Sequence, residues 1–542
     1  MLKRLYAYTT WIAAVAFILL ALMVSVARVF LPLVAEERAL IEARVGELLG
    51  QPIRIASVEA DIRWLVPRAY LQDVEMLDPS GEQVLLRAEQ FIIDFDPLDS
   101  LLALAPRIRQ VSVRGVDLEV TRTHDDRLVV LGVWEQSLRE AARERSGAAW
   151  AGLRDLRFNV GESRVHWVDE PTGRDFVFER IQLAIELDEQ RLRVAGRLDP
   201  PADLGKSLEV VADLRGDLHR AGGWSGSVYA RGDSLHFPLL PAGTLLARQG
   251  LEEGEGSIEV WSRWREGRPV RIAGKAALKG LAFRLAPAMD APGSHRLDRL
   301  AGRFVWEDRG DDGWRLQAEE LSVERDGRAW PAGGFEVALK SGEDGRFLRV
   351  SSDTLRLEDV APLARLGDYL DPDLRERLAR LAPRGDVRDL WLDASWQGGR
   401  VDWLRADGRV GNLGFEPLPE LRLPGLSGLD AHFEATRDGG ELTLITGGLG
   451  VTYPNVFEQP LEIEQLLGTL QWRRGRDGWR VQTDRMQVVN ADLRVAGTLA
   501  VEGPRDAATV IDLRLDVEDG RVAAVHRYLP KTLAPNVRSW LA

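Results

Sequence analysis

The chain has 542 residues, of which 45% are hydrophobic and 29% charged, so it is too apolar to be disordered and can bury a core. Its length exceeds the roughly 250 to 300 residues at which a single core stops growing, which predicts several subdomains or an elongated architecture. A formal net charge of -13 disfavours a nucleic-acid partner, and the absence of cysteine excludes disulfides, a thiolate nucleophile and cysteine-ligated metal.

An uncharged stretch of 23 residues, Leu5 to Ala27, follows the basic pair at positions 3 and 4. As an α-helix it would reach about 34 Å, enough to cross a hydrocarbon core of about 30 Å. A cleaved signal peptide is the alternative, because residues 25–27 (SVA) are small, but the apolar part of such a peptide normally spans about 7 to 15 residues. We therefore expect a retained transmembrane anchor, with the N-terminus in the cytoplasm and the bulk of the chain on the far side. Its candidate residues are Trp11, Phe17, Leu20 and Val24.

The next predicted element is a short helix over Ala35 to Leu49, which has one apolar face and is ended by Gly50. Beyond it, apolar residues recur at every second position, which is the period of half-buried strands. Turn signals such as residues 78–81 (DPSG) separate these runs and favour antiparallel hairpins. The apolar positions of three such runs are Phe91, Ile93 and Phe95; Val116, Leu118 and Val120; and Ile181, Leu183 and Ile185.

Three helical segments are predicted to interrupt the strands, roughly over Gly132 to Arg145, over Leu357 to Leu381, and from Val522 onward. The last of these resembles the second, but it stops at Ala542, before the strand that follows in the earlier copy. We therefore expect the sequence to be the N-terminal part of a longer polypeptide.

No constellation of residues points to catalysis. The seven histidines stand singly, without the spacing of a zinc site, so we expect no metal site and no cofactor. Residues 232–235 (GDSL) match a lipase-type nucleophile block, but neither His432 nor His526 has the aspartate three residues before it that such an enzyme requires. Counting 84 acidic residues does not exclude a two-carboxylate glycosidase, although nothing singles out a pair. We expect a protein that is not an enzyme.

The stretch from Gly50 to Val120 resembles the N-terminal module of the AsmA-like superfamily. The features that carry this likeness are the preceding anchor and helix, residues 50–53 (GQPI), and the strand patterns from Phe91 and from Val116. Later segments resemble the YhdP branch of that superfamily: residues 162–167 (ESRVHW), the helix pair before residues 383–385 (PRG), and residues 527–530 (RYLP).

This resemblance implies a mainly β fold, in which an N-terminal transmembrane helix precedes an elongated, curled antiparallel β-sheet that forms a bridge-like groove with short interrupting helices. It also implies non-enzymatic phospholipid transport between the inner and outer membranes, in support of the outer-membrane barrier. The protein would cross the inner membrane once, with its C-terminal bulk in the periplasm. Its partners would be phospholipid, the inner membrane, and outer-membrane or periplasmic proteins.

On this basis we expect seven segments along the chain. They are a cytoplasmic tip and anchor (1–34), the AsmA-like N-terminal module (35–125), a helical insertion (126–160), a β-sheet groove segment (161–356), a helical interruption (357–386), a second groove segment (387–521) and the start of a second, truncated helical interruption (522–542).

The apolar strand positions given above are the candidate groove residues, and burying each methylene of an acyl chain against them would contribute about 0.8 kcal/mol. A period of two does not by itself separate a face that lines a groove from one that packs against protein. The alternative function is therefore a membrane-anchored scaffold for outer-membrane protein assembly or envelope biogenesis. Such a scaffold would bind protein at a sheet edge and have a filled interior.

Overall fold

The computed structural model describes most of the chain. The described residues are 38–39, 42–43, 52–63, 66–77, 84–103, 107–125, 128–130, 133–134, 156–171, 173–188, 190–217, 222–237, 251–285, 293–342, 345–365, 372–397, 400–421, 423–505, 508–529 and 531. The predicted membrane anchor lies outside them. Within these ranges no helix has both the length and the hydropathy that a membrane span requires.

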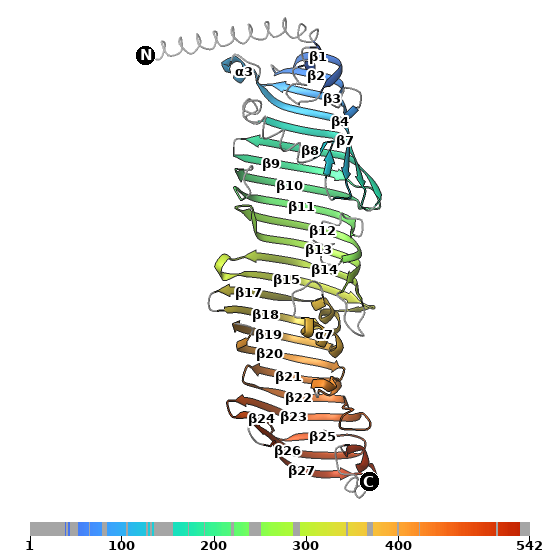
Figure 1. Cartoon of the computed structure of the whole chain (residues 1–542), viewed down its shortest axis with the longest axis vertical. Helices are drawn as coiled ribbons and strands as arrows, with labels where there is room; N and C mark the ends of the chain where they lie inside the picture. Colours follow the sequence, from blue (N-terminus) through green and yellow to red (C-terminus); the bar gives the residue numbers. More distant parts are fainter. Residues whose placement is uncertain are drawn as a thin grey trace, which may run out of the picture. The chain divides into compact units, whose positions relative to one another are not determined.

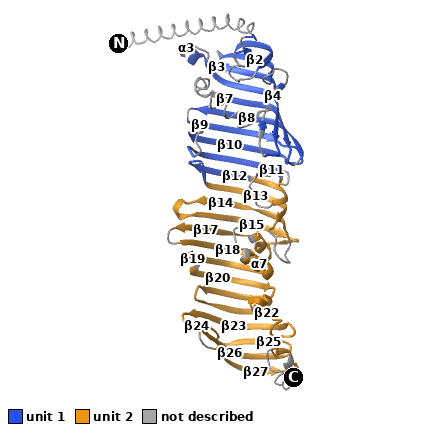
Figure 2. Cartoon of the chain, viewed as in Figure 1, with its two compact units in different colours: residues 1–235, 259–269 blue, residues 236–258, 270–542 orange. Residues whose placement is uncertain are grey.

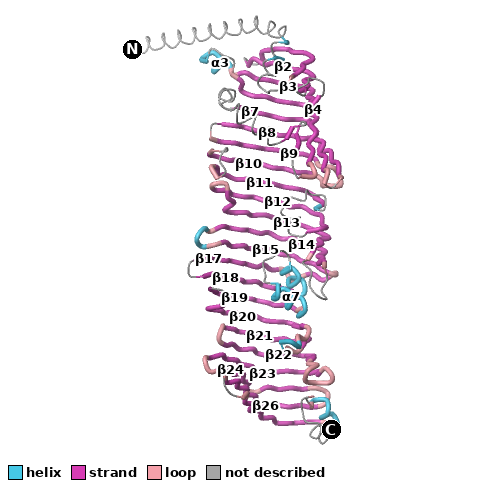
Figure 3. Tube along the Cα trace, viewed as in Figure 1, coloured by secondary structure: helices cyan, strands magenta, loops and turns pink. Residues whose placement is uncertain are grey.

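The fold is mainly β, as expected from the period of two, and strands occupy most of the described chain (Figure 3). The chain divides into two compact units, one of residues 1–235 and 259–269, the other of residues 236–258 and 270–542 (Figure 2). Two strands, β12 (Leu251–Arg265) and β13 (Arg268–Arg284), contribute residues to both units.

Unit 1 begins with a meander in which each strand pairs antiparallel with the next, from β1 to β4. A second antiparallel meander runs from β7 to β11. The elements are β1 (Ile53–Arg63), β2 (Val66–Leu77), β3 (Val84–Phe95), α3 (Pro97–Ala103), β4 (Ile108–Arg122), β5 (Leu128–Val130), β6 (Val133–Trp134), β7 (Leu156–Asp169), β8 (Arg174–Asp188), β9 (Arg191–Asp199), β10 (Ser207–Gly216) and β11 (Trp224–His236).

The two meanders of unit 1 meet at a parallel pair, β4 and β7, which lie side by side in Figure 1. The expectation of a purely antiparallel sheet is wrong at this pair, because parallel strands need a crossover and cannot be joined by a tight hairpin. The crossover includes β5, which pairs antiparallel with the end of β4, and β6. Residues 133 and 134 thus form a strand where a helix was predicted from Gly132, and residues 135–155 lie outside the described ranges.

Unit 2 is antiparallel at every described strand pair. Its elements are β14 (Ser294–Asp308), η3 (Gly310–Asp312), β15 (Trp314–Arg325), β16 (Arg328–Ala329), β17 (Gly333–Gly342), β18 (Gly345–Arg356), α6 (Leu357–Val360), η4 (Ala361–Arg365), α7 (Pro372–Leu381), β19 (Arg384–Gln397), β20 (Arg400–Phe415), η5 (Pro419–Leu421), β21 (Gly425–Thr436), β22 (Gly439–Thr452), β23 (Leu461–Gly475), β24 (Gly478–Thr483), β25 (Met486–Val489), β26 (Leu493–Pro504), β27 (Val510–Gly520) and η6 (Val522–Tyr528).

Four helices of unit 2 fall where the sequence predicts helical interruptions, whereas η3 and η5 were not predicted. α6, η4 and α7 lie between Leu357 and Leu381, and the 3-10 helix η6 begins at Val522. Each is short, and α7 is the longest at 10 residues. Strand pairing therefore determines the architecture, and these helices are local additions to it.

Each unit has its own cluster of buried apolar side chains. In unit 1 the cluster contains Ile55, Val58, Leu71 and Val74, and Ile55 is fully buried. In unit 2 it contains Leu429, Ala431, Leu444, Leu449 and Leu466. The members of each cluster come from neighbouring strands, so each core forms along one face of a sheet.

Candidate functional site

One face of unit 1 is apolar from strand to strand, because the pairing register aligns apolar positions. Val58 in β1 lies opposite Leu71 in β2, which lies opposite Phe91 in β3. Phe91 in turn lies opposite Val113 in β4. Directly opposed residues of an antiparallel pair share a face, so these four side chains form one apolar row across the sheet.

The alternation along a strand is interrupted by residues in the left-handed region. In β4, Gly115 has a φ of +63° and separates Val113 from Val116. Both valines nevertheless lie on the apolar face, because Val116 is opposite Ala88, which is opposite Val74 of the buried cluster. Further left-handed residues in the strands of unit 1 are Asp73 in β2, Glu162 in β7, Arg180 in β8 and Ser234 in β11. A strict period of two therefore assigns the wrong face beyond each interruption.

Replacing Gly115 with valine is expected to destabilise unit 1 by about 1–2 kcal/mol, because a side chain is disfavoured in the left-handed region. Gly161 of the neighbouring strand β7 provides the control, since its φ is not left-handed and a Cβ there would meet open space. Urea unfolding of both variants measures the difference. Equal midpoints for Gly115→Val and Gly161→Val would show that the interruption at Gly115 carries no strain.

The candidate groove residues of β3 and β4 share this apolar face. Phe91 and Ile93 pack against the buried cluster of unit 1, and Phe95 continues the same alternation to a position opposite Ile108. Leu118 and Val120 lie beside Val165 and Trp167 of the parallel neighbour β7. Val120 is buried at 9% exposure, whereas Val116 and Leu118 are half-buried.

The candidates of β8 extend the face across β7. Ile181, Leu183 and Ile185 lie opposite Ser163, Val160 and Phe158 respectively, and all three are half-buried. The structure therefore brings the candidates of three separate runs onto one face. Their role in binding lipid stays a prediction.

The apolar face is packed at one place and open at another. Val113 is only 3% exposed, whereas Val210 in β10 is 44% exposed. Val210 belongs to the same face, because it lies opposite Gly196, which lies opposite Leu183.

The other face of unit 1 is charged. Glu186 in β8 contacts Arg157 and Arg193 at 3.3 and 3.1 Å, and Arg191 Nε donates to Asp213 Oδ1 at 2.8 Å. The guanidinium of Arg191 holds the pKa of the Asp213 carboxyl below its usual range, mainly through this hydrogen bond. The sheet is thus amphipathic, with ion pairs on one face and an apolar surface on the other.

The apolar face ends at a buried ion pair. Arg122 follows Val120 at the end of β4, and its Nη1 lies 3.2 Å from Asp169 Oδ1 in β7. The two residues are 9% and 4% exposed. Buried charges are tolerated where they are paired, so this pair sets a polar limit to the apolar face.

The lipase-like residues 232–235 form part of β11, and the charged side chain among them pairs with neighbouring residues. Asp233 accepts hydrogen bonds from Arg231 Nε at 3.1 Å and from Ser207 Oγ at 3.1 Å. Ser234 has a φ of +52°, which makes it one of the left-handed interruptions. These contacts account for Asp233 as part of the strand.

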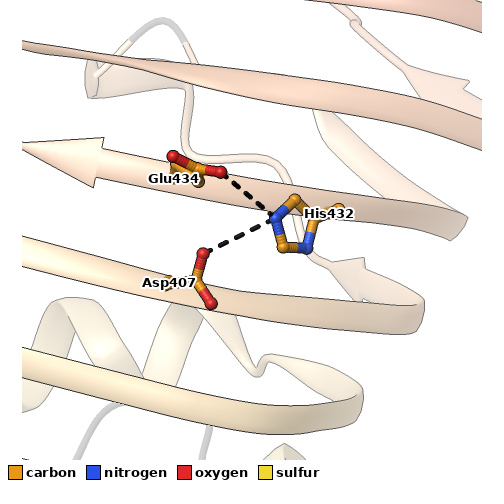
Figure 4. A group of neighbouring side chains, drawn as sticks. All are labelled: Asp407, His432 and Glu434. Carbon is orange, nitrogen blue, oxygen red and sulfur yellow. Dashed lines mark ion pairs between the residues drawn. The ribbon is translucent and has the colours of Figure 1, made fainter.

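Unit 2 contains a group that the sequence analysis missed, formed by Asp407, His432 and Glu434 (Figure 4). His432 Nε2 lies 3.5 Å from Asp407 Oδ2 and 3.7 Å from Glu434 Oε1. Glu434 and His432 are two residues apart on β21, and Asp407 lies opposite Glu434 on β20. The signal in the sequence is a His-x-Glu spacing on a strand, which becomes a three-ligand group only through the pairing register. The group offers one imidazole nitrogen and two carboxylate oxygens, which are ligands that a divalent cation accepts.

Comparison with known proteins assigns the family. The sequence model of the YhdP protein family matches residues 1–542. The chain belongs to the YhdP family. A curated relative, the intermembrane phospholipid transporter YhdP of Escherichia coli (strain K12), is 22% identical over 547 residues. The match covers 98% of this chain and 41% of the relative, so the chain spans about two fifths of the relative's length.

Membership of the YhdP family confirms the resemblance carried by residues 162–167 and 527–530. In this YhdP-family chain the apolar face of unit 1 also includes residues that the sequence analysis did not select. Phe176 and Phe178 in β8 lie opposite Trp167 and Val165 of β7, and Val111 in β4 lies opposite Ile93. Their alternation was visible in the sequence, but only the register shows that they join the same face.

Proposed function

We propose that this protein carries phospholipid between the inner and outer membranes without chemical conversion, with the acyl chains lying on the apolar face of unit 1. Two findings support the proposal. The curated relative is named an intermembrane phospholipid transporter, and the apolar face of unit 1 crosses consecutive strands in register. The second of these carries the argument, because an acyl chain needs a continuous apolar surface and no catalytic group.

The energetics of such a face suit movement along it. Burial of a methylene contributes about 0.8 kcal/mol wherever it occurs on the face, so the acyl chains are held by the summed apolar surface. A chain can then shift by one strand while losing and regaining similar contacts. The function requires no cofactor and no metal.

The membrane placement follows from the N-terminal sequence. We propose that residues 1–34 anchor the protein in the inner membrane by a single span and that the remaining chain lies in the periplasm. Trp11, Phe17, Leu20 and Val24 would contact lipid within that span. This topology places the apolar face between the two membranes, where transported phospholipid supports the outer-membrane barrier.

Photocrosslinking on the two faces of unit 1 tests the proposal. A photoreactive residue at Leu118 or Leu183 on the apolar face is expected to give phospholipid adducts, detected by mass spectrometry of the purified chain. The matched controls are Glu119 and Gln182, which are the sequence neighbours on the charged face and are exposed. Adducts at both apolar positions should exceed those at both controls at least fivefold.

Equal yields on the two faces would contradict the transport proposal. Protein adducts in place of lipid adducts at Leu118 and Leu183 would favour the alternative, a scaffold for envelope assembly. An unrelated detergent-purified membrane protein of similar size gives the background for lipid that adheres to any apolar surface.

A further inference from the structure

Unit 2 contains a cavity of about 480 Å³ between its helices and the ends of three strands. Residues of α6, η4 and α7 line one side, and Leu285, His295 and Arg325 line the other, at the ends of β13, β14 and β15. The volume falls within the range of ligand pockets, which is about 300 to 1,000 Å³. The cavity adjoins buried apolar residues, since Leu297 two positions after His295 lies opposite Leu281.

His295 brings a buried hydrogen-bonding atom to this cavity. The residue is 4% exposed, and its Nε2 has no hydrogen-bond partner in the described part of the chain. Burial, and then the charge of Arg325, lower the pKa of His295, so its imidazole is neutral at pH 7. Its other ring nitrogen donates to the backbone of Asp359. Nε2 therefore presents a lone pair that can accept a hydrogen bond. Because buried polar atoms are normally hydrogen-bonded, we expect a ligand in the cavity to donate to it.

Arg365 brings a buried positive charge to the same cavity. It is 4% exposed, at the end of η4, and lines the cavity together with Arg296 and Arg325. Burial and the neighbouring guanidinium of Arg375 lower the pKa of Arg365, but an arginine side chain remains protonated. Guanidinium groups that line one cavity favour an anion with several oxygens, such as a phosphate.

Carboxylates supply the opposite charge at the same cavity. Asp326, Glu358 and Glu416 line it. Glu416 is held by Arg384 at 2.5 Å, and Glu358 accepts a hydrogen bond from the Gly385 backbone at 2.9 Å. A ligand in this cavity therefore meets positive charge, negative charge and a neutral acceptor within one small volume.

We propose that this cavity binds the phosphoethanolamine headgroup of a phospholipid, with its phosphate at Arg365 and its ammonium donating to Nε2 of His295. The inference rests on the proposed lipid transport and adds a headgroup preference to it. A primary ammonium has three N–H donors for the imidazole and the carboxylates, whereas the quaternary ammonium of phosphocholine has none. The acyl chains would leave the cavity along the apolar residues that follow His295 in β14.

Calorimetric titration of the full chain in detergent tests the headgroup preference. Glycerophosphoethanolamine is expected to bind about tenfold more tightly than glycerophosphocholine, which corresponds to one hydrogen bond gained. Inorganic phosphate is the third probe. Phosphate binding as tight as that of glycerophosphoethanolamine would identify a free-phosphate site and overturn the proposal. Dihexanoyl phosphatidylethanolamine should bind more tightly than the soluble headgroup, and equal affinity would exclude the lipid as the source.

Two substitutions separate the roles of the cavity residues. Arg365→Gln should lower the affinity for both headgroup probes at least tenfold. Arg365→Lys should retain part of that affinity because the charge remains. His295→Leu should abolish the tenfold preference and leave glycerophosphocholine binding unchanged. Wild-type affinities in Arg365→Gln, or an undiminished preference in His295→Leu, would refute the assignment.

Matched controls lie in the same unit. His236 also has a buried ring nitrogen without a partner but does not line the cavity, so His236→Leu should keep the preference. Arg409 pairs with Asp389 away from the cavity, so Arg409→Gln should bind as the wild type does. Far-UV circular dichroism and thermal melting confirm that each variant folds. If lipid adducts persist at Leu118 and Leu183 while the headgroup preference is absent, the inference fails and the transport proposal stands.

Discussion

The phospholipid that co-purifies with the full chain is expected to fall at least fivefold when Leu118 is replaced with arginine. Leu118 is half-buried on the apolar face of unit 1, beside Val165 of β7. A guanidinium at this position would have to lose water whenever an acyl chain passes, which opposes the gain of about 0.8 kcal/mol for each methylene. Quantitative lipid mass spectrometry, expressed per mole of folded protein, measures the effect.

The neighbouring position provides the control for this prediction. Glu119 is exposed on the charged face, so Glu119→Arg introduces the same side chain where it remains in water. We expect its lipid content to match that of the wild type. A folded Leu118→Arg chain with normal lipid content would remove Leu118 from the lipid-binding face, and an equal loss in both variants would indicate an effect of charge alone.

Replacing Asp359 with alanine is expected to lower the stability of unit 2 by about 3 kcal/mol. Asp359 is 3% exposed, and its carboxylate accepts hydrogen bonds from Arg325 Nη1 and Trp330 Nε1, both at 2.8 Å. Its loss leaves the Trp330 N–H without its acceptor in a largely buried place and removes a charged partner from Arg325, which keeps only the Glu358 carbonyl and Asp326 among the described residues. Urea unfolding followed by far-UV circular dichroism measures the change.

Glu502 is the control for Asp359, because it also pairs with an arginine, Arg480, at 2.9 Å but lies exposed in β26. Exposed ion pairs contribute about 0 to 1 kcal/mol, so Glu502→Ala should shift the unfolding midpoint little. Similar midpoints for the two variants would show that Asp359 does not hold α6 against the sheet.

The strand content of the protein was predictable because the alternation of apolar residues that indicates a strand lies within a few consecutive residues. Ile181, Leu183 and Ile185 alternate with small or polar residues in the sequence and are less exposed than Gln182 and Ala184 in β8. The parallel pairing of β4 with β7 was not predictable, since it joins Val111 to Phe158 and no turn signal marks a pairing over that distance. The interruptions at Asp73 and Arg180 were missed because neither residue is a glycine, the usual sign of a left-handed position.

The candidate sites also differ in how far they could be predicted from the sequence. The apolar face was accessible from the sequence because each strand repeats one simple pattern, and the structure adds only how the strands align. His295 and Arg365 could not be found, because one is in β14 and the other in η4, and each looks ordinary in its own segment. Asp407 joins His432 and Glu434 only through the pairing of β20 with β21.

The parallel pair in unit 1 has a consequence for how the protein is made. Strands β1 to β4 leave the ribosome as successive hairpins, so each can pair with the strand just before it. The edge of β4 that will receive β7 then has no partner until a segment 47 residues further along has been synthesised. An open edge of this kind templates pairing with other chains, so this interval is when the nascent protein is most exposed to aggregation. A chaperone that covers strand edges would be needed there more than at any of the hairpins.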